Sequence, residues 1–360
     1  MEKKKLTFPH MGDYGVVAKY LFEHILNVDV FLAPPITNKT IELGNKYSPS
    51  FVCTPFKYTL GTMIEGLDNK ADIIVQAGGG CRYGYYGELQ EKILKDLNYD
   101  FKFINLVTCG KTDLKKICDM LKEIDPKFSK IKSLYYLLIS KKMIKYMDDI
   151  DGIIRSNIGF EVRKGSFKRL KTRMLNSFSN TKGLFDLIKK YRNFKKEFKN
   201  LEVKKPNNPL KVGIIGELYT VMEPFANYDL ENMLAAFNIE VKRFTNVNYL
   251  LFEKHKKIKK YLKNTKYIKY KMGSDAADNI ARTKYLCENN YDGIIHIKSS
   301  FCTPEIGAMP VISKICNEYN TPIIYFSFDS NTSVVGIKTR IEAFYDMIEM
   351  RRNNELLRRN

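Results

Sequence analysis

Strand-like runs alternate with amphipathic helical patterns twice along this chain, and this alternation constrains the fold more than any other feature. A run rich in Val, Ile and Phe, followed by apolar residues at helical spacing, is typical of βαβ units with parallel strands. In residues 1–125 the predicted strands are KLTFPH, VDVFLAPP, ADIIVQAGG and DFKFINLV. After the turn-rich KKPNNPLK they are KVGIIGELY, IEVKRF, YDGIIHIKSS and TPIIYFSFD. The sequence therefore predicts an α/β fold with two parallel-sheet halves.

The segment between these halves carries most of the positive charge. The formal net charge of the chain is +20, and residues 126–205 contain 22 Lys or Arg against 7 Asp or Glu, a net charge of +15. Apolar residues recur there at helical spacing, which indicates amphipathic helices with a solvated basic face. The alternative is a docking surface for an acidic protein or a polyanionic ligand. No zinc-finger or leucine-zipper pattern accompanies the charge, so nucleic acid is not favoured as a partner.

We therefore expect an N-terminal α/β domain at 1–125, a basic helical connecting segment at 126–205 and a C-terminal α/β domain at 206–360. No stretch approaches the roughly 20 apolar residues that span a bilayer. The N-terminus, MEKKKLTFPHMG, lacks the long apolar region of a signal peptide. Seven cysteines without an export signal do not suggest a disulfide framework. These features predict a cytoplasmic protein with no membrane partner.

Three cysteines are predicted to lie where strands lead into helices. Cys53 comes just before Pro55 in SFVCTPFKY, and Cys81 follows the strand ADIIVQ directly. Cys302 comes just before Pro304 in SSFCTPEIGAMP, so two of the three share the tripeptide Cys-Thr-Pro. Open α/β sheets bind ligands at the carboxyl ends of their strands, and helix N-termini stabilise thiolate sulfur. We expect all three thiols at strand-to-helix junctions on this ligand-binding edge.

These cysteines suggest a metal centre, although their spacing does not choose the metal. Thiols at distant junctions without Cys-x-x-C pairs fit an iron–sulfur cluster, whereas structural zinc normally has four ligands in local pairs. Three ligands would leave one iron of a 4Fe–4S cluster open to an outside ligand. Cys109, in NLVTCGKTD, is a fourth ligand, a spare thiol near the site or an ordinary loop cysteine. Cys118, Cys287 and Cys316 lie in helical patterns, where cysteine is usually a small buried side chain.

The glycine run in QAGGGCRYGYYGELQ does not match a phosphate-binding loop. Cys81, Arg82 and Tyr83 stand where a dinucleotide fingerprint would place phosphates, and the P-loop consensus is missing. We expect Gly79 and Gly80 instead to form a turn that brings the backbone close to a bulky cluster. ATP chemistry would then belong to a partner protein.

Glu217 and His10 are candidates for further site residues. Glu217 ends the predicted strand in GIIGELY, so it is a helix cap, a surface acid or a residue facing the site. His10 ends the first predicted strand in FPHMGDYG and either lines a cleft or has a structural role. His296 lies inside a strand pattern and is predicted to be in the core. No histidine–acid partnership accompanies Ser299 or Ser300, so the sequence does not suggest a serine hydrolase.

At these residues the chain resembles proteins related to the 2-hydroxyacyl-CoA dehydratase D component, often described as CoA-substrate-specific enzyme activase-related. The segments that carry the resemblance are CTPFKYTLGTMIEGLDNKADIIVQAGGGCRYGYYGELQEKILKDL, GIIGELYTVMEPFANYDLENML and FCTPEIGAMPVISKICNEYNTPIIYFSFDSNTSVVGIKTRIEAF. They cover both α/β halves, and the basic segment is least distinctive. The resemblance implies two flavodoxin-like or Rossmann-like halves, with a 4Fe–4S cluster held in their cleft by Cys53, Cys81 and Cys302.

The resemblance also implies a partner and a class of chemistry. In the characterised dehydratases an ATP-dependent activator supplies one electron, which the cluster passes to an acyl-CoA thioester. This chain is a single polypeptide, whereas dehydratases pair two homologous cluster subunits. Ser330, Asn331, Thr332 and Ser333 also replace an acid–His–Thr type of segment after the last strand. These departures put dehydratase activity in doubt.

The resemblance therefore implies an oxygen-sensitive iron–sulfur protein that accepts an electron from an activator. Its electron acceptor would be a small molecule, for which acyl-CoA is a candidate, or a protein. If the chain is an enzyme, it would be a radical-type lyase or a reductase. The alternative is a non-catalytic iron–sulfur binding or assembly subunit that docks a partner through the basic segment. A homodimer or a heterodimer is compatible with both.

Overall fold

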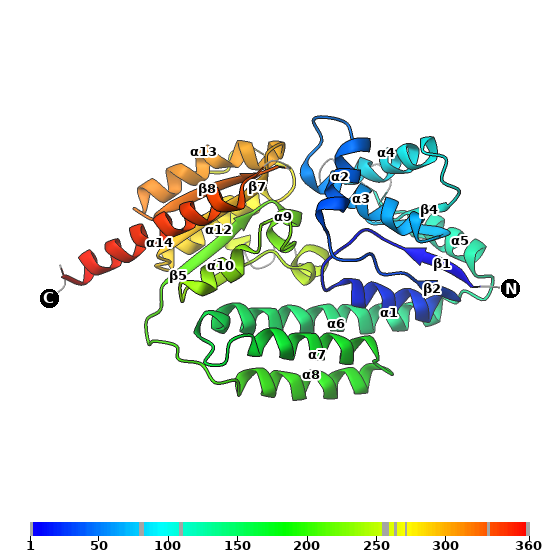
Figure 1. Cartoon of the computed structure of the whole chain (residues 1–360), viewed down its shortest axis with the longest axis horizontal. Coiled ribbons are helices and arrows are strands. Elements are labelled where there is room, and N and C mark those ends of the chain that lie inside the picture. The colour runs from blue at the N-terminus through cyan, green and yellow to red at the C-terminus, as the bar shows by residue number, and fades with distance from the viewer. Residues whose placement is uncertain are drawn as a thin grey trace. The chain divides into compact units, whose positions relative to one another are not determined.

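Two four-stranded parallel sheets organise the computed structural model (Figure 1). It describes residues 3–78, 83–107, 111–253, 259–262, 265–270, 272–329 and 332–357. The strand orders are β2-β1-β3-β4 and β6-β5-β7-β8, and all pairings are parallel. The strands are β1 (Lys4–Thr7), β2 (Val28–Val30), β3 (Ile73–Gln76), β4 (Lys102–Asn105), β5 (Lys211–Gly216), β6 (Glu240–Arg243), β7 (Gly293–Ser299) and β8 (Ile323–Phe328). Seven strands lie within predicted runs and β1 begins one residue before its run, which confirms the α/β fold with two parallel sheets.

The chain divides into two compact units, each built on one sheet. Unit 1 is Met1–Lys145 with Leu175–Lys190, and unit 2 is Tyr146–Met174 with Tyr191–Asn360. The helices of unit 1 that surround its sheet are α1 (Gly15–Ile25), α2 (Asn38–Tyr47), α3 (Thr54–Asp68), α4 (Tyr83–Asp96) and α5 (Leu114–Ile124). Those of unit 2 are α9 (Leu218–Met222), α10 (Leu230–Ala236), α11 (Lys259–Leu262), α12 (Ala276–Glu288), α13 (Thr303–Glu318) and α14 (Val334–Leu357), with a π-helical turn, η2 (Tyr249–Glu253).

Helices cover both faces of each sheet. In unit 1, Ile73 and Val75 of β3 pack with residues of α1 and α5, whereas Ile74 packs with residues of α3 and α4. In unit 2, Ile295 of β7 packs with residues of α10 and α14, whereas Ile294 packs with residues of α12 and α13. Successive side chains of a strand point to opposite faces, so these apolar runs bury both faces.

The two units therefore share strand order and layering. In each, the helix that leads into the third strand and the helix that follows it lie on the same face of the sheet. By this correspondence α3 of unit 1 is the counterpart of α12 of unit 2, and α4 is the counterpart of α13. The position of each candidate cysteine ligand in one unit can therefore be compared with the equivalent position in the other unit.

Residues 126–205 are helical, as predicted for the basic connecting segment. They contain α6 (Lys130–Asn157), a 3₁₀ turn, η1 (Ile158–Phe160), α7 (Ser166–Ser179) and α8 (Leu184–Lys199). The boundaries between the two units fall inside these three helices. The division of the chain at residues 125 and 205 stays a prediction. No helix in the part of the chain that the structure describes is both long and apolar enough to cross a membrane.

Helix α2 was not predicted, because its sequence NKTIELGNKY is mostly polar. A capping box starts it: the Thr37 hydroxyl accepts from the backbone N–H of Thr40, and the Thr40 hydroxyl accepts from that of Thr37. Glycines let α2 pack closely on α3. A Cβ at Gly44 would lie 2.1 Å from the carbonyl oxygen of Lys57, and one at Gly61 would lie 2.1 Å from that of Thr40. This crossing fixes the start of α3, where Cys53 lies.

Candidate functional site

Cys53 is the N-cap residue of α3, and Pro55 lies in the first turn of that helix. Helix α3 ends at Asp68 and β3 begins at Ile73, so α3 runs antiparallel to β3 and its N-terminus lies at the carboxyl edge of the sheet. The prediction of a strand-to-helix junction is wrong here, because the unpredicted helix α2 precedes Cys53. The prediction that Cys53 lies at the carboxyl edge of the sheet agrees with the direction of α3.

A chain of buried amides ties α3 and α4 to the end of β3. The Gln76 side chain donates to Gln90 Oε1 at 2.6 Å, and Gln90 Nε2 donates to Thr59 Oγ1 at 2.7 Å. Gln76 ends β3, Gln90 belongs to α4 and Thr59 to α3. All three side chains are buried, so these bonds form in a protected environment and hold the helix starts in place.

The thiol of Cys53 contacts the first turn of α4. Its Sγ lies 3.0 Å from Tyr86 Oη, within hydrogen-bonding distance. Tyr86 is buried, and its ring packs edge-to-face on Phe56 of α3 with 4.8 Å between centroids. The hydroxyl is thereby fixed beside the sulfur. Gly79, Gly80 and Cys81 immediately precede this helix in the sequence but lie outside the described residues, as does Cys109.

Cys302 is the N-cap residue of α13 and follows β7, so its prediction as a strand-to-helix junction agrees with the structure. Pro304 lies in the first helical turn. The residue is 8% exposed, and its backbone N–H donates to the carbonyl oxygen of Ser299 at 3.0 Å. Neither Cys302 nor Cys53 uses its side chain to cap its helix.

A buried lysine lies at the same edge. Lys298 of β7 is 4% exposed, and among the described residues its Nζ donates only long hydrogen bonds, to the carbonyl oxygens of Ser299 at 3.4 Å and Ser300 at 3.3 Å. Burial lowers the pKa of Lys298, and the nearby groups Cys302 and Glu305 oppose that shift. A cationic Lys298 would stabilise negative charge on the Cys302 sulfur.

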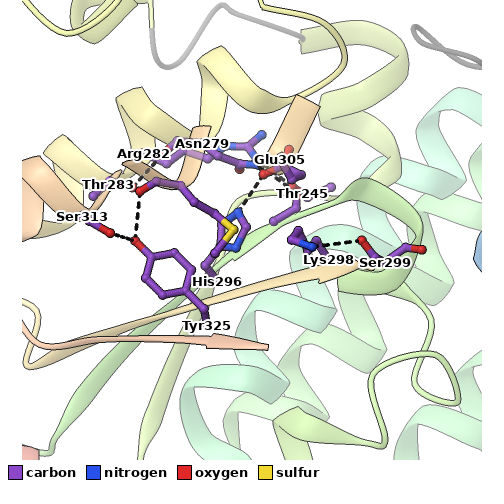
Figure 2. Close-up of polar contacts among 12 residues, drawn as sticks. Thr245, Asn279, Arg282, Thr283, His296, Lys298, Ser299, Glu305, Ser313 and Tyr325 are labelled. Atoms are coloured by element: carbon purple, nitrogen blue, oxygen red, sulfur yellow. Dashed lines mark hydrogen bonds and ion pairs between the residues drawn. The ribbon is translucent and has the colours of Figure 1, made fainter. Parts of the chain in front are cut away.

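A polar network joins β7, α13 and α12 in unit 2 (Figure 2). His296 Nε2 lies 2.8 Å from Glu305 Oε2, and Asn279 Nδ2 donates to both carboxylate oxygens of Glu305 at 3.0 Å. Arg282 donates from Nη1 to Asn279 Oδ1 at 2.8 Å and to Thr245 Oγ1 at 2.7 Å. His296 is fully buried, as its core prediction requires, and is part of this network rather than of an apolar cluster. The network links β7, α13 and α12, which are the unit 2 counterparts of the three elements that the glutamine chain links in unit 1.

Glu217 caps a helix, which is one of the three alternatives that the sequence left open. Its carboxylate accepts from the backbone N–H groups of Tyr219 at 2.9 Å and Thr220 at 3.0 Å at the start of α9. It is 3% exposed, so it is not a surface acid, and burial raises its pKa. Gly216 before it has φ +141°, and a Cβ there would lie 1.8 Å from the carbonyl oxygen of Ile297. Only glycine fits this close approach of β5 to β7.

His10 lies beyond the end of β1 and is tied to neighbouring backbone. Its Nδ1 lies 3.4 Å from the carbonyl oxygen of Ala33, and its backbone N–H donates to Thr62 Oγ1 at 3.3 Å. Burial lowers the pKa of His10. These contacts accord with the structural alternative for this residue, and its role as a site residue stays a prediction.

The remaining cysteines differ in burial. Cys287 and Cys316 are buried in the core between α12 and α13, as predicted, whereas Cys118 is only half-buried because α5 buries little more than Leu121. Within the described ranges, no three His, Cys, Asp or Glu side chains gather closely enough to hold a metal ion, and Cys81 is outside those ranges.

Sequence reasoning missed Tyr86 and Lys298. A signal for Lys298 was available, since it is the only charged residue inside the apolar strand GIIHIKS. Tyr86 offered none, because three tyrosines occur close together in YGYYG and only the helix phase decides which one turns toward Cys53.

The comparison with family models identifies the chain. The model described as 2-hydroxyglutaryl-CoA dehydratase, D-component, matches residues 28–348, and this range includes Cys53, Cys302 and every strand of the two sheets except β1. A search among curated proteins returned no match. The match spans nearly the whole chain and agrees with the segments that carry the resemblance in the sequence. The chain therefore belongs to the 2-hydroxyglutaryl-CoA dehydratase D-component family.

Proposed function

We propose that this protein is an iron–sulfur subunit related to the 2-hydroxyacyl-CoA dehydratases, with a 4Fe–4S cluster held by Cys53, Cys81 and Cys302. The observation that carries the proposal is the matching environment of the two described thiols. Cys53 and Cys302 each stand at the N-cap of a proline-started helix, and neither caps that helix with its side chain. A thiolate there is stabilised by the N–H groups and dipole of the helix.

The chemistry of the surrounding groups fits a thiolate-bound cluster. Such a cluster, when bound, supplies one-electron transfer. The Tyr86 hydroxyl can donate a hydrogen bond to the Cys53 sulfur, and the Lys298 ammonium places positive charge near Cys302. Both groups are buried and would favour the electron-rich state of a nearby centre. Gly79 and Gly80 would let the backbone pass close to the cluster beside Cys81.

The proposed electron donor is a separate ATP-dependent activator. The absence of a P-loop consensus from the sequence supports this assignment, because ATP turnover would then need another protein. Membership of a CoA dehydratase family supports a small-molecule acceptor of the acyl-CoA class. A protein acceptor would make the chain an electron carrier rather than a lyase or reductase.

The decisive experiment is anaerobic purification of the full chain with iron and acid-labile sulfide analysis. We expect about 4 iron and about 4 sulfide per chain, and an EPR signal after reduction. Cys53→Ser, Cys81→Ser and Cys302→Ser should each lower the iron content while the circular dichroism spectrum stays unchanged. Cys118→Ser is the matched control and should keep full iron. A wild-type protein that stays colourless after anaerobic reconstitution contradicts the proposal.

A further inference from the structure

Helix α6 exposes an apolar stripe in its first turns, within unit 1. Ile131, Leu134, Tyr135 and Leu138 are 85, 60, 48 and 58% exposed, and their spacing of i, i+3, i+4 and i+7 places them on one side of the helix. We call these four residues the α6 stripe. A surface helix normally keeps its apolar side toward the core and its polar side toward water. The first turns of α6 are apolar on both sides.

The opposite side of the same turns already packs against unit 1. Tyr136 contacts the aromatic rings of Tyr20 and His24 on α1, and Ile139 and Met143 are fully buried. The α6 stripe is therefore not needed to attach the helix to its own unit. The start of α8 lies beside it: a Cβ at Gly183 would be 3.3 Å from Tyr135 Oη.

Phe185, also in unit 1, extends the exposed apolar surface next to this point. It is 88% exposed and follows Gly183 by two residues. Exposed aromatic and aliphatic side chains that cluster on neighbouring helices are typical of protein-binding surfaces.

The charged residues around the α6 stripe are all positive. Residues 126–145 contain six lysines and no acidic residue, and all six are exposed: Lys127, Lys130, Lys132, Lys141, Lys142 and Lys145. Lys142 and Lys145 follow Leu138 by four and seven residues, so they continue the side of the helix that the stripe begins. Along this side, apolar groups come first and ammonium groups follow.

We propose that the α6 stripe docks an acidic amphipathic helix of a partner protein. The apolar side of that helix covers Ile131, Leu134 and Leu138, and its carboxylates face Lys142 and Lys145. This inference does not depend on the proposed cluster, since it rests on a surface remote in sequence from all three cysteines.

The positive charge beside the α6 stripe favours an acidic helix over a second copy of the chain, a lipid surface or a nucleic acid. A symmetric contact with a second copy would place the same lysines against one another. A flat lipid surface that covered the stripe would also have to cover Lys142, at the cost of desolvating an ammonium group. Phosphates of a nucleic acid would pair with the lysines but would leave the apolar side chains without a contact.

The test uses fluorescence anisotropy with the full chain and a fluorescein-labelled synthetic helix of about five turns. Its first turns carry leucines at i, i+3, i+4 and i+7, and its last turns carry glutamates. A scrambled peptide of the same composition is the matched probe. We expect binding that weakens with added salt, and at least about tenfold weaker binding for Leu134→Glu and for Lys142→Glu. A peptide with lysine in place of its glutamates should bind Lys142→Glu better than wild type.

Val335→Glu, an exposed substitution on α14, is the control and should bind as wild type does. Equal binding of the scrambled peptide, or equal loss in Val335→Glu, overturns the proposal. Self-association of the wild type that Leu134→Glu abolishes would assign the stripe to a second copy. Sedimentation with phosphatidylglycerol vesicles that Leu134→Glu prevents would assign it to a membrane surface. Each of these two results also overturns the proposal.

Discussion

Tyr86 lies beside a proposed cluster ligand, with its hydroxyl 3.0 Å from the Cys53 sulfur. Hydrogen bonds to the sulfurs of an iron–sulfur cluster raise its reduction potential by stabilising the reduced state. Tyr86→Phe should therefore shift the midpoint potential to more negative values by tens of millivolts, as measured by an EPR-monitored redox titration. The neighbouring Tyr85 is 60% exposed, and Tyr85→Phe should leave the potential unchanged. Equal potentials in all three proteins would contradict a role for Tyr86.

Glu217 should make stability depend on pH. Burial raises its pKa above the ordinary value of 4.5, so the folded protein holds this proton at pH values where the unfolded chain has lost it. The stabilising contribution is fully present below 4.5 and is lost as pH rises through the raised pKa. Urea unfolding from about pH 5 to about pH 8 should show a steeper loss of stability in wild type than in Glu217→Gln. Parallel curves for the two proteins would contradict this assignment.

For individual residues, the sequence predicted where each one lies relative to a helix start better than it predicted which side chains contact it. Cys53, Cys302 and Glu217 could be placed near helix starts because proline and strand patterns mark those starts. The hydrogen bond between Tyr86 and Cys53 joins α4 to α3, and the Gln76–Gln90–Thr59 chain joins both to β3. Such contacts depend on helix phase and packing, which a strand–helix pattern does not specify.

At the scale of elements, the α2–α3 crossing determines the environment of Cys53. Gly61→Ala would bring a methyl group to 2.1 Å from the Thr40 carbonyl oxygen, so α2 must shift. We expect a loss of about 1–3 kcal/mol in unfolding free energy, measured by urea denaturation, together with weaker iron retention.

Gly152→Ala in α6 is the matched control for this substitution. Beyond the helix's own backbone, no atom of the described residues lies within 4 Å of a Cβ at Gly152, so alanine there should gain helix propensity and stabilise the protein by about 0.5–1 kcal/mol. A Gly61→Ala protein as stable as Gly152→Ala would show that the crossing is not tight.

The crossing also explains why α2 escaped prediction. Its apolar side is narrow, since Thr40 and Gly44 are its only fully buried residues among the described ones. Close backbone contact at the two glycines attaches α2 to α3, together with the hydrogen bond from Thr40 to Glu65 and the partly buried side chains of Leu43 and Tyr47. Hydrophobic periodicity detects helices that bury large side chains, as it did for α3 and α12.

At the scale of the whole molecule, unit 2 includes helical residues that precede residue 206. The backbone N–H of Asn248 donates to Asp148 Oδ2 at 2.8 Å, and Lys205 pairs with Glu240 at 3.0 Å. A Cβ at Gly159 would lie 3.0 Å from the carbonyl oxygen of Ala235. Residues 206–360 alone would lose these contacts and expose the apolar groups beneath them.

We therefore expect a fragment of residues 146–360 to unfold cooperatively, and a fragment of residues 206–360 to aggregate or to unfold without a clear transition. Thermal unfolding followed by circular dichroism distinguishes the two. A cooperative transition in the shorter fragment would instead support a domain boundary near residue 205. Strand alternation predicted both sheets, but it could not assign the connecting helices to a unit, because amphipathic patterns do not reveal which surface a helix packs on.

The shared tripeptide Cys-Thr-Pro occupies positions that do not correspond between the units. Cys53 starts α3, which precedes the third strand of its sheet, and Cys302 starts α13, which follows the third strand. The unit 2 counterpart of Cys53 is Asp275, the N-cap residue of α12. If the two units descend from one ancestral gene, the tripeptides were not inherited from it together. In that case they arose separately, and their likeness is a convergence on one local arrangement that places sulfur at the start of a helix.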